Sequence, residues 1–276
     1  MLETLSVDVL VPLAAVMLGA GVAAGLLAGL LGVGGGIVIV PVLFHLFDVI
    51  GVEEAIRMHL AVGTSLATII PTSISSTRAH YKRAAVDLTI LKSWGPGVLV
   101  GVALGAALAA QLDGRALTGV FAAVALLIAA NMAFRGDDWR LRETLPGGPA
   151  LFSIGGVVGL LSSMMGIGGG AMSTPIMTAC GVPIRRAVGT AAAIGLIIAV
   201  PGAIGFAISG LGVEGTPPLT LGYVSLVGFA LVAPTTALVA PLGARLTHSI
   251  PPGLLRKAFA LFLFATAVRM IYGLIS

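Results

Sequence analysis

Long apolar runs, separated by turn residues or short charged clusters, follow one another along almost the whole chain. Most approach the roughly 20 residues that a helix needs to span the hydrocarbon core of a bilayer. The predicted fold class is therefore an all-α integral membrane protein. Ten helical segments are predicted, at about Val7–Leu31, Ile37–Ile50, Leu60–Thr77, Leu88–Leu112, Ala116–Phe134, Pro149–Met165, Ala171–Gly181, Ala187–Ser209, Leu221–Leu246 and Leu254–Ile275. The second and seventh are short, so each either crosses as a short helix inside the bundle or dips in and returns.

The composition also indicates a lipid environment. With 58% hydrophobic residues, 9% charged residues and a mean hydropathy of +1.10, the chain has too little polar surface to cover a soluble globule. The net charge is +4, but the basic residues lie in short clusters between apolar runs, as in membrane loops. The N-terminal MLETLSVDVL lacks the basic residues of a signal peptide, so the first span is predicted to be retained. We expect a multi-pass protein of the bacterial inner membrane, surrounded by the lipid bilayer and without a nucleic-acid partner.

One stretch occurs twice. Gly25–Pro41 reads GLLAGLLGVGGGIVIVP, and Gly159–Pro175, 134 positions later, reads GLLSSMMGIGGGAMSTP. Each copy contains three consecutive glycines, Gly34–Gly36 and Gly168–Gly170. A glycine costs about 1 kcal/mol relative to alanine inside a helix, so each triplet predicts a break between two helices.

A broken helix at membrane depth has a chemical consequence. Its freed backbone groups must be buried in protein or line a wet cavity. The helix that restarts after the break directs unpaired N–H groups and its positive dipole end toward that cavity, which suits an anion. Duplicated breaks of this kind are a sequence pointer to the substrate site of a secondary transporter.

The repeat extends beyond the glycines and divides the chain. Residues 1–135 are predicted to form a first membrane repeat, residues 136–148 a cytoplasmic linker, and residues 149–276 a second membrane repeat. Further pairs match between the halves, for example Gly63, Thr64 and Ser65 with Gly189, Thr190 and Ala191.

Loop charge predicts the orientation. If all ten segments cross, twelve basic residues share one side and two, Arg57 and Arg115, lie on the other. The positive-inside rule makes the first side cytoplasmic. The twelve are Arg78, Lys82, Arg83, Lys92, Arg135, Arg140, Arg142, Arg185, Arg186, Arg245, Arg256 and Lys257. With about five segments per half, the second repeat is inverted, and the two breaks approach a common centre from opposite faces.

The candidate substrate-binding residues combine both breaks with polar residues at membrane depth. Membrane Ser and Thr hydroxyls also often bond to carbonyls of their own helix, and Arg269 is near enough to the C-terminus to reach the membrane surface. His45, which shares a helical face with Asp48, is the candidate proton carrier, although an interfacial position explains Asp48 equally well. The substrate-binding set is Gly34, Gly35, Gly36, Thr64, Ser65, Gly168, Gly169, Gly170, Thr190, Asn131 and Arg269.

Other chemistry finds little support in the sequence. The single cysteine, Cys180, excludes an internal disulfide and is expected to pack as a small buried hydrophobe. No intramembrane carboxylate pair, His-rich metal set or Ser/His dyad is evident, so no catalytic residue, metal or cofactor is predicted. Gly21, Gly25 and Gly29, spaced by four, are expected to allow close helix packing.

The doubled GLLxxxxGxGGG, followed five residues later by Pro, together with AVGTS at 61–65 and AVGTA at 187–191, resembles the TauE/SafE family. The family contains sulfite and organosulfonate exporters and is also called the toluenesulfonate uptake permease family. The resemblance covers nearly the whole chain. It implies transport of small sulfur-containing anions such as sulfite or sulfoacetate, commonly out of the bacterial cytoplasm.

Alternatives to a sulfur-anion exporter stay open at this point. An importer of another small organic anion, such as a carboxylate, uses the same site chemistry. A membrane-embedded enzyme needs a catalytic set that the sequence does not offer, and a non-transporting assembly partner needs no site. The sequence leaves a homodimer open and does not decide the direction or the coupling of transport.

Overall fold

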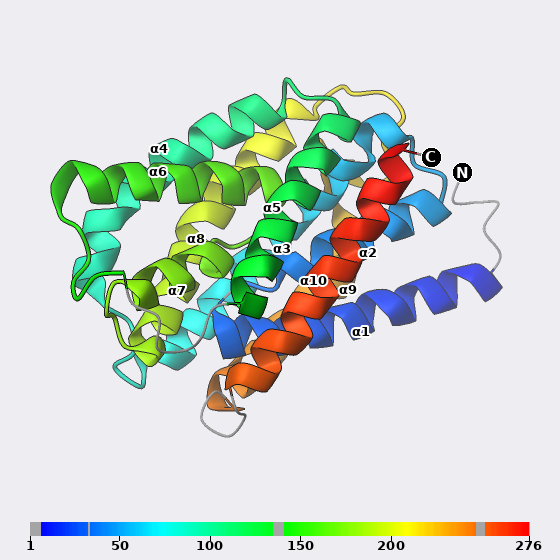
Figure 1. Cartoon of the computed structure of the whole chain (residues 1–276). Coiled ribbons are helices and arrows are strands. Elements are labelled where there is room, and N and C mark those ends of the chain that lie inside the picture. Colours follow the sequence, from blue (N-terminus) through cyan, green and yellow to red (C-terminus); the bar gives the residue numbers. More distant parts are fainter. Residues whose placement is uncertain (1–6, 33, 135–140, 247–251, 276) are drawn as a thin grey trace.

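The computed structural model describes residues 7–32, 34–134, 141–246 and 252–275 (Figure 1). Within these residues the fold is helical, as predicted, with one short antiparallel hairpin, β1 (Thr220–Leu221) and β2 (Val224–Ser225). The described helices are α1 (Val7–Leu31), α2 (Gly36–Val49), α3 (Glu54–Tyr81), α4 (Leu88–Ala109), α5 (Gly114–Phe134), α6 (Gly148–Met165), α7 (Gly170–Ala179), α8 (Ile184–Ser209), α9 (Leu226–Leu246) and α10 (Pro252–Ile275).

The largest errors in the predicted boundaries concern two segments. The segment predicted at Leu60–Thr77 is the longer α3, because polar side chains near its ends find partners inside the bundle: His59 Nε2 lies 3.0 Å from the Ala109 carbonyl oxygen. The segment predicted from Leu221 begins at Leu226, because the apolar residues before it form the β1–β2 hairpin, which turns at Gly222 with a φ of +54°.

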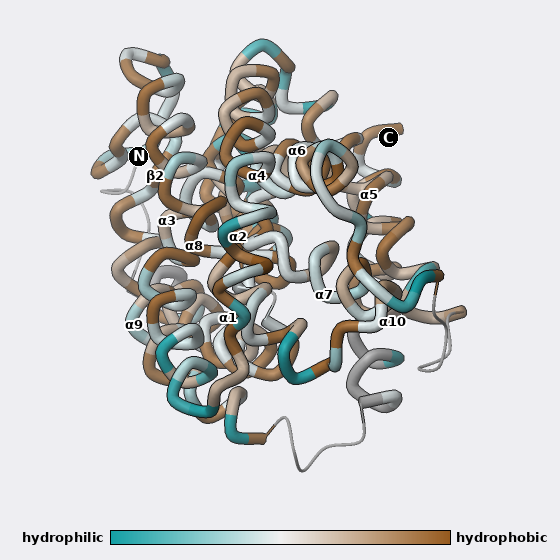
Figure 2. The backbone as a smooth tube through the Cα atoms, turned by 90° about the vertical axis from the view of Figure 1, so that its left-hand side faces the viewer, coloured by the Kyte–Doolittle hydropathy of each residue, from teal (hydrophilic) through white to brown (hydrophobic). Residues whose placement is uncertain are grey.

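The outer surface of the bundle is apolar. In the described part of the chain, six helices are long and apolar enough to cross a membrane, namely α1, α4, α5, α6, α8 and α9. Leu127 on α5 and Leu238 on α9 are 70% and 76% exposed, as lipid-facing side chains are. Figure 2 shows hydrophobic positions along the helices and hydrophilic ones mainly in the turns that join them.

Helices of the two halves pair with one another. In Figure 1, α1 lies along α9 and α4 lies along α6, while α3 packs against α8 and α5 against α10. If α1–α5 are exchanged in order with α6–α10, the α1–α9 pair becomes the α6–α4 pair. The α3–α8 and α5–α10 pairs stay the same. This pairing is what a duplicated structure predicts; the division at residues 135 and 149 and the inverted orientation stay predictions.

Glycines allow the helices of the α1–α9 and α4–α6 pairs to approach closely. A Cβ on Gly25 of α1 would lie 2.7 Å from the Thr236 carbonyl oxygen of α9, and one on Gly159 of α6 would lie 2.2 Å from the Val98 carbonyl oxygen of α4. Carbon and oxygen cannot approach so closely, so only glycine permits these distances. The expected packing role of the glycine stripe on α1 agrees with these contacts.

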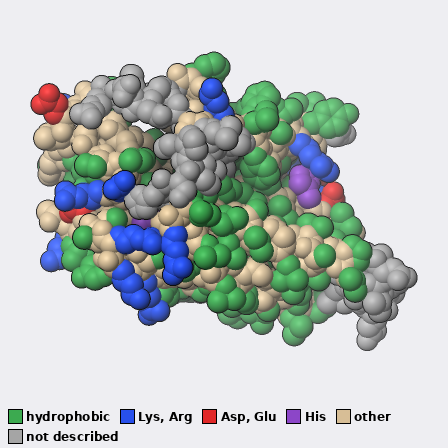
Figure 3. All heavy atoms as spheres, turned by 90° about the horizontal axis from the view of Figure 1, so that it is seen from below, with side chains coloured by type: hydrophobic (Ala, Val, Ile, Leu, Met, Phe, Trp, Pro, Cys, Tyr) green, Lys and Arg blue, Asp and Glu red, His purple; other side chains and the backbone are tan. Residues whose placement is uncertain are grey.

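Basic residues gather at one end of the bundle, which we call the basic end. It consists of the C-terminal ends of α3 and α9 with the N-terminal end of α8, and Figure 3 shows Lys and Arg side chains clustered over one part of the face seen from below. Its described cavity-lining cations are Arg78, Lys82, Arg83, Arg185, Arg186 and Arg245. At the opposite end of α3, Arg57 forms an ion pair with Asp48 at 2.9 Å. Arg135 and Arg140, assigned to the basic side in the sequence, lie outside the described residues.

Candidate functional site

Both glycine triplets break the helices that contain them. Gly32, Gly34 and Gly35 have φ values of +67°, +73° and +79°, and they separate α1 from α2. Gly166 and Gly169 have φ values of +66° and +73°, and they lie between α6 and α7. A side chain in this left-handed conformation costs about 1–2 kcal/mol. The breaks therefore depend on glycine for their backbone conformation.

The two breaks are in direct contact, although 134 positions separate them. A Cβ on Gly34 would lie 3.2 Å from Gly168 Cα, and one on Gly36 would lie 2.2 Å from the Gly166 carbonyl oxygen. The Ser65 hydroxyl of α3 donates a hydrogen bond of 2.7 Å to that same carbonyl. The bond joins α3 of the first half to the end of α6 in the second.

The contact lies at middle depth in the bundle. Ser65 and Ile69, which flank the first break, are in the central turns of α3, and a Cβ on Gly195, in the centre of α8, would lie 2.8 Å from the Gly168 carbonyl oxygen. The ends of α3 carry Arg57 on one side and Arg78 on the other. The breaks are thus about equally far from the two polar ends.

The helices that restart at the breaks begin with buried backbone N–H donors. The Gly35 carbonyl accepts hydrogen bonds from the N–H groups of Val38 and Ile39 at 3.0 and 3.2 Å. The Gly169 carbonyl accepts the N–H groups of Met172 and Ser173 at 3.1 and 2.8 Å in the same way. The two N–H groups that precede these in each helix have no intrahelical acceptor, and the positive dipole ends of α2 and α7 add to their potential. The arrangement suits a small anion chemically.

Two buried serines that the sequence analysis did not select lie beside the second break. Ser73 and Ser162 are each 1% exposed, and within the described residues neither hydroxyl has a hydrogen-bond partner. The Cβ position of Gly195 is 2.9 Å from Ser73 Oγ, and that of Gly169 is 3.7 Å from Ser162 Oγ. A buried hydroxyl without a partner is costly, so both are further candidate donors. Ser162 lies in the repeated stretch Gly159–Pro175, and this position was the sequence signal that could have identified it as a candidate.

Thr64 and Thr190 use their hydroxyls within the protein. Thr64 Oγ1 on α3 accepts the backbone N–H of Ser225 at 2.8 Å, and Thr190 Oγ1 on α8 accepts that of Asp87 at 2.9 Å. Ser225 immediately precedes α9, and Asp87 immediately precedes α4. The two threonines therefore perform equivalent contacts in the two halves, each holding the start of another helix.

The glycines before these threonines complete the contact. A Cβ on Gly63 would lie 2.3 Å from the Tyr223 carbonyl oxygen, and one on Gly189 would lie 2.3 Å from the Ala85 carbonyl oxygen. In both cases the residue with this carbonyl lies two positions before the residue whose N–H the threonine hydroxyl accepts. We call each Gly-Thr pair with the loop that it contacts a loop clamp. The repeated Gly-Thr motif thus has a packing function in both halves.

The structure does not bring the other candidates to the breaks. Arg269 is exposed on α10, which packs along α5, and Asn131 is half-buried on α5 itself. The Arg115 guanidinium at the start of α5 donates to the Leu274 carbonyl at the end of α10, so the two helices are antiparallel. His45 is half-buried on α2, where its ring lies edge-on to that of Phe44, with 5.5 Å between the ring centroids. In residues 7–32, 34–134, 141–246 and 252–275, no group of three His, Cys, Asp or Glu side chains is placed to hold a metal ion.

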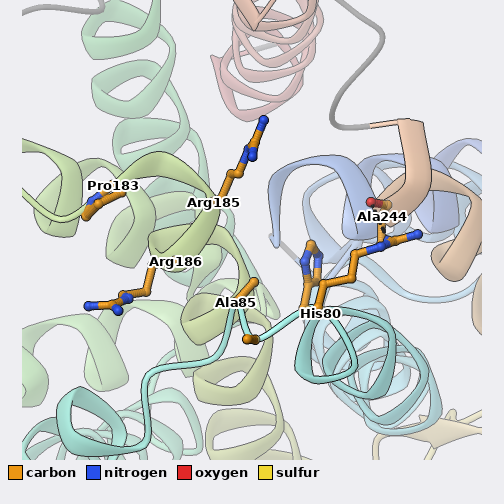
Figure 4. Close-up of a pocket in the computed structure, with 8 residues that line it drawn as sticks. His80, Ala85, Pro183, Arg185, Arg186 and Ala244 are labelled. Atoms are coloured by element: carbon orange, nitrogen blue, oxygen red, sulfur yellow. Dashed lines mark hydrogen bonds between the residues drawn. The ribbon is translucent and has the colours of Figure 1, made fainter.

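Two cavities open at the basic end. One, of about 590 Å³, extends from Arg245 and Lys82 inward to Pro71, two residues after Ile69, whose side chain covers Gly34. The other, of about 310 Å³, lies between the end of α3 and the start of α8 and is shown in Figure 4. Cationic side chains line both, so the approach to the centre of the bundle from this side favours anions.

Comparison with known proteins gives consistent relationships. A family model described as "Sulfite exporter TauE/SafE" matches residues 17–270. A "Probable membrane transporter protein" of Haemophilus influenzae is 34% identical over 253 residues, covering 91% of this chain and 95% of the relative. A protein of Methanocaldococcus jannaschii with the same description is 28% identical, covering 84% and 85%, and one of Bacillus subtilis is 30% identical, covering 69% and 77%. No solved structure matches the chain.

Proposed function

Since the chain belongs to the TauE/SafE sulfite exporter family, we propose that it is a secondary transporter that carries small sulfur oxyanions out of the bacterial cytoplasm. The substrate class is sulfite or an organosulfonate such as sulfoacetate. The observation that carries this proposal is the mid-depth contact between the breaks, where a Cβ on Gly34 would lie 3.2 Å from Gly168 Cα.

A sulfo or sulfite group has several oxygens that accept hydrogen bonds in different directions. Two opposed helix starts supply backbone donors from both sides without a fixed positive charge. Such a site holds an anion but also releases it, as a transporter requires. The Ser73 and Ser162 hydroxyls supply further donors beside the second break. The Ser65 hydroxyl donates to Gly166 when the breaks touch, and it is available to an anion once they separate.

Transport then proceeds by alternating access. The breaks separate to admit the anion from the basic end, which the positive-inside rule makes cytoplasmic, and one repeat moves against the other to release it outside. The membrane potential, negative inside, favours exit of an anion by about 2.3 kcal/mol per charge per 100 mV. Export therefore needs no coupling ion; if a proton is carried, His45 on α2 is the candidate.

Efflux from proteoliposomes tests the proposal. Vesicles containing the purified protein are loaded in turn with sulfite, sulfoacetate, sulfate and a small carboxylate, and release is followed after a potential, negative inside, is imposed. We expect protein-dependent release of sulfite or sulfoacetate, accelerated by the potential. Release of the carboxylate alone would favour the alternative organic-anion permease, and release of none of them would refute the transport assignment.

A further inference from the structure

We propose that the smaller cavity at the basic end is a capture site for the anionic substrate, with Arg185 as its principal ligand. The inference rests on the proposed function and adds a second, peripheral site to the one at the glycine breaks. The cavity has about 310 Å³, which is ample for sulfite or a small sulfonate. Its lining consists of His80, Arg83, Ala84, Ala85, Pro183, Arg185, Arg186 and Ala244 and contains no carboxylate.

The arginines of this cavity differ in whether they already contact another group of the protein. Arg83 Nη1 donates to the Ala244 carbonyl at 3.0 Å, and Arg186 Nη1 lies 3.4 Å from a carboxylate oxygen of Asp87. Arg185 forms no ion pair in the part of the chain that the structure describes. In Figure 4 the Arg185 side chain extends upward from the start of α8 on the side of His80, whereas Arg186 points to the opposite side. Among the three arginines that line the cavity, Arg185 is thus the one without such a contact to the described residues.

The cavity also borders the loop that one of the loop clamps holds. Its wall includes Ala84 and Ala85, and the Ala85 carbonyl packs on Gly189, next to the Thr190 hydroxyl that binds Asp87. An anion at Arg185 therefore lies beside the loop that joins α3 to α4.

Substitution of Arg185 tests the capture site in everted membrane vesicles, whose cytoplasmic face is outward. Initial rates of radiolabelled sulfite uptake are measured over a range of concentrations for the wild type and for R185Q, R185K and R142Q. Arg142 is the matched control, because it is exposed near the end of α7 and lines neither cavity. We expect R185Q to raise KM roughly three- to tenfold, as for loss of one partly screened charge-assisted contact, with an unchanged maximal rate.

The controls separate the two proposals. R185K should keep most of the affinity because it keeps the charge, and R142Q should have the KM of the wild type. High salt should reduce the difference in KM between the wild type and R185Q. Equal KM values for R185Q and R142Q, with normal wild-type transport, would overturn the capture site and leave the proposed function intact. Absence of sulfite transport by the wild type would instead refute the proposed function. A fall in maximal rate without a change in KM would also overturn the capture site.

Discussion

Replacing Gly36 with alanine tests whether the contact between the breaks holds the centre of the molecule. Gly36 begins α2, and a Cβ there would lie 2.2 Å from the Gly166 carbonyl oxygen and 2.9 Å from Ser65 Oγ. The φ of Gly36 is not positive, so alanine adds no left-handed strain. The breaks must then separate by about 1 Å, the shortfall from an ordinary van der Waals contact, and Ser65 must shift and give up its bond to Gly166.

The magnitude follows from these two costs. Overpacking costs about 1–3 kcal/mol, and a lost hydrogen bond adds about 1 kcal/mol. We expect Gly36→Ala to reduce the free energy of unfolding by about 2–4 kcal/mol and to impair sulfite transport. Gly19→Ala is the matched control, because Gly19 is inside α1 with no atom within 4 Å of its Cβ position. Alanine there should be neutral or stabilising by up to about 1 kcal/mol.

Thermal unfolding in detergent and sulfite efflux from proteoliposomes, at equal amounts of inserted protein, measure the two effects. The reasoning predicts a lower melting temperature and slower efflux for Gly36→Ala alone. If Gly36→Ala and Gly19→Ala behave alike in both assays, the breaks do not pack as described.

Two further pairs of substitutions probe the site and the loop clamps. Gly35→Leu and Gly169→Leu should each abolish sulfite-dependent thermal stabilisation while the protein stays membrane-inserted, since their φ values are +79° and +73° and a Cβ there would lie 2.8 Å from the Ala24 carbonyl oxygen and 2.3 Å from Ile198 Cδ1; stabilisation retained in both would count against the site. Thr64→Val and Thr190→Val should each lower stability by about 1–3 kcal/mol, because a buried backbone N–H loses its acceptor; unfolding curves that match the wild type would show that the clamps contribute nothing.

Much of the fold could be predicted from the sequence. The apolar runs give the class and most helix boundaries, because a bilayer requires continuous helix wherever it meets backbone. The bounds of α1 agree with the predicted Val7–Leu31. The family prediction, drawn from the repeated glycine and Gly-Thr motifs, is confirmed by the match over residues 17–270.

Prediction failed where distant residues supply the partners. Arg57 and His80 appeared to lie beyond the ends of α3, yet Arg57 pairs with Asp48 and His80 Nε2 lies 3.1 Å from the Gly29 carbonyl, so the helix continues through both. The same limit applies to the structural contact of Thr64, whose role as a substrate ligand stays a prediction. Its partner, the N–H of Ser225, lies 161 positions away, and no local pattern indicates that distance.

A structure determined with sulfite bound would test the central claim most directly. The account predicts that the anion lies between the two breaks, with its oxygens within hydrogen-bond distance of the first N–H groups of α2 and α7. Sulfite found only at the basic end, with Gly34 and Gly168 still in contact and no anion at the breaks, would contradict it.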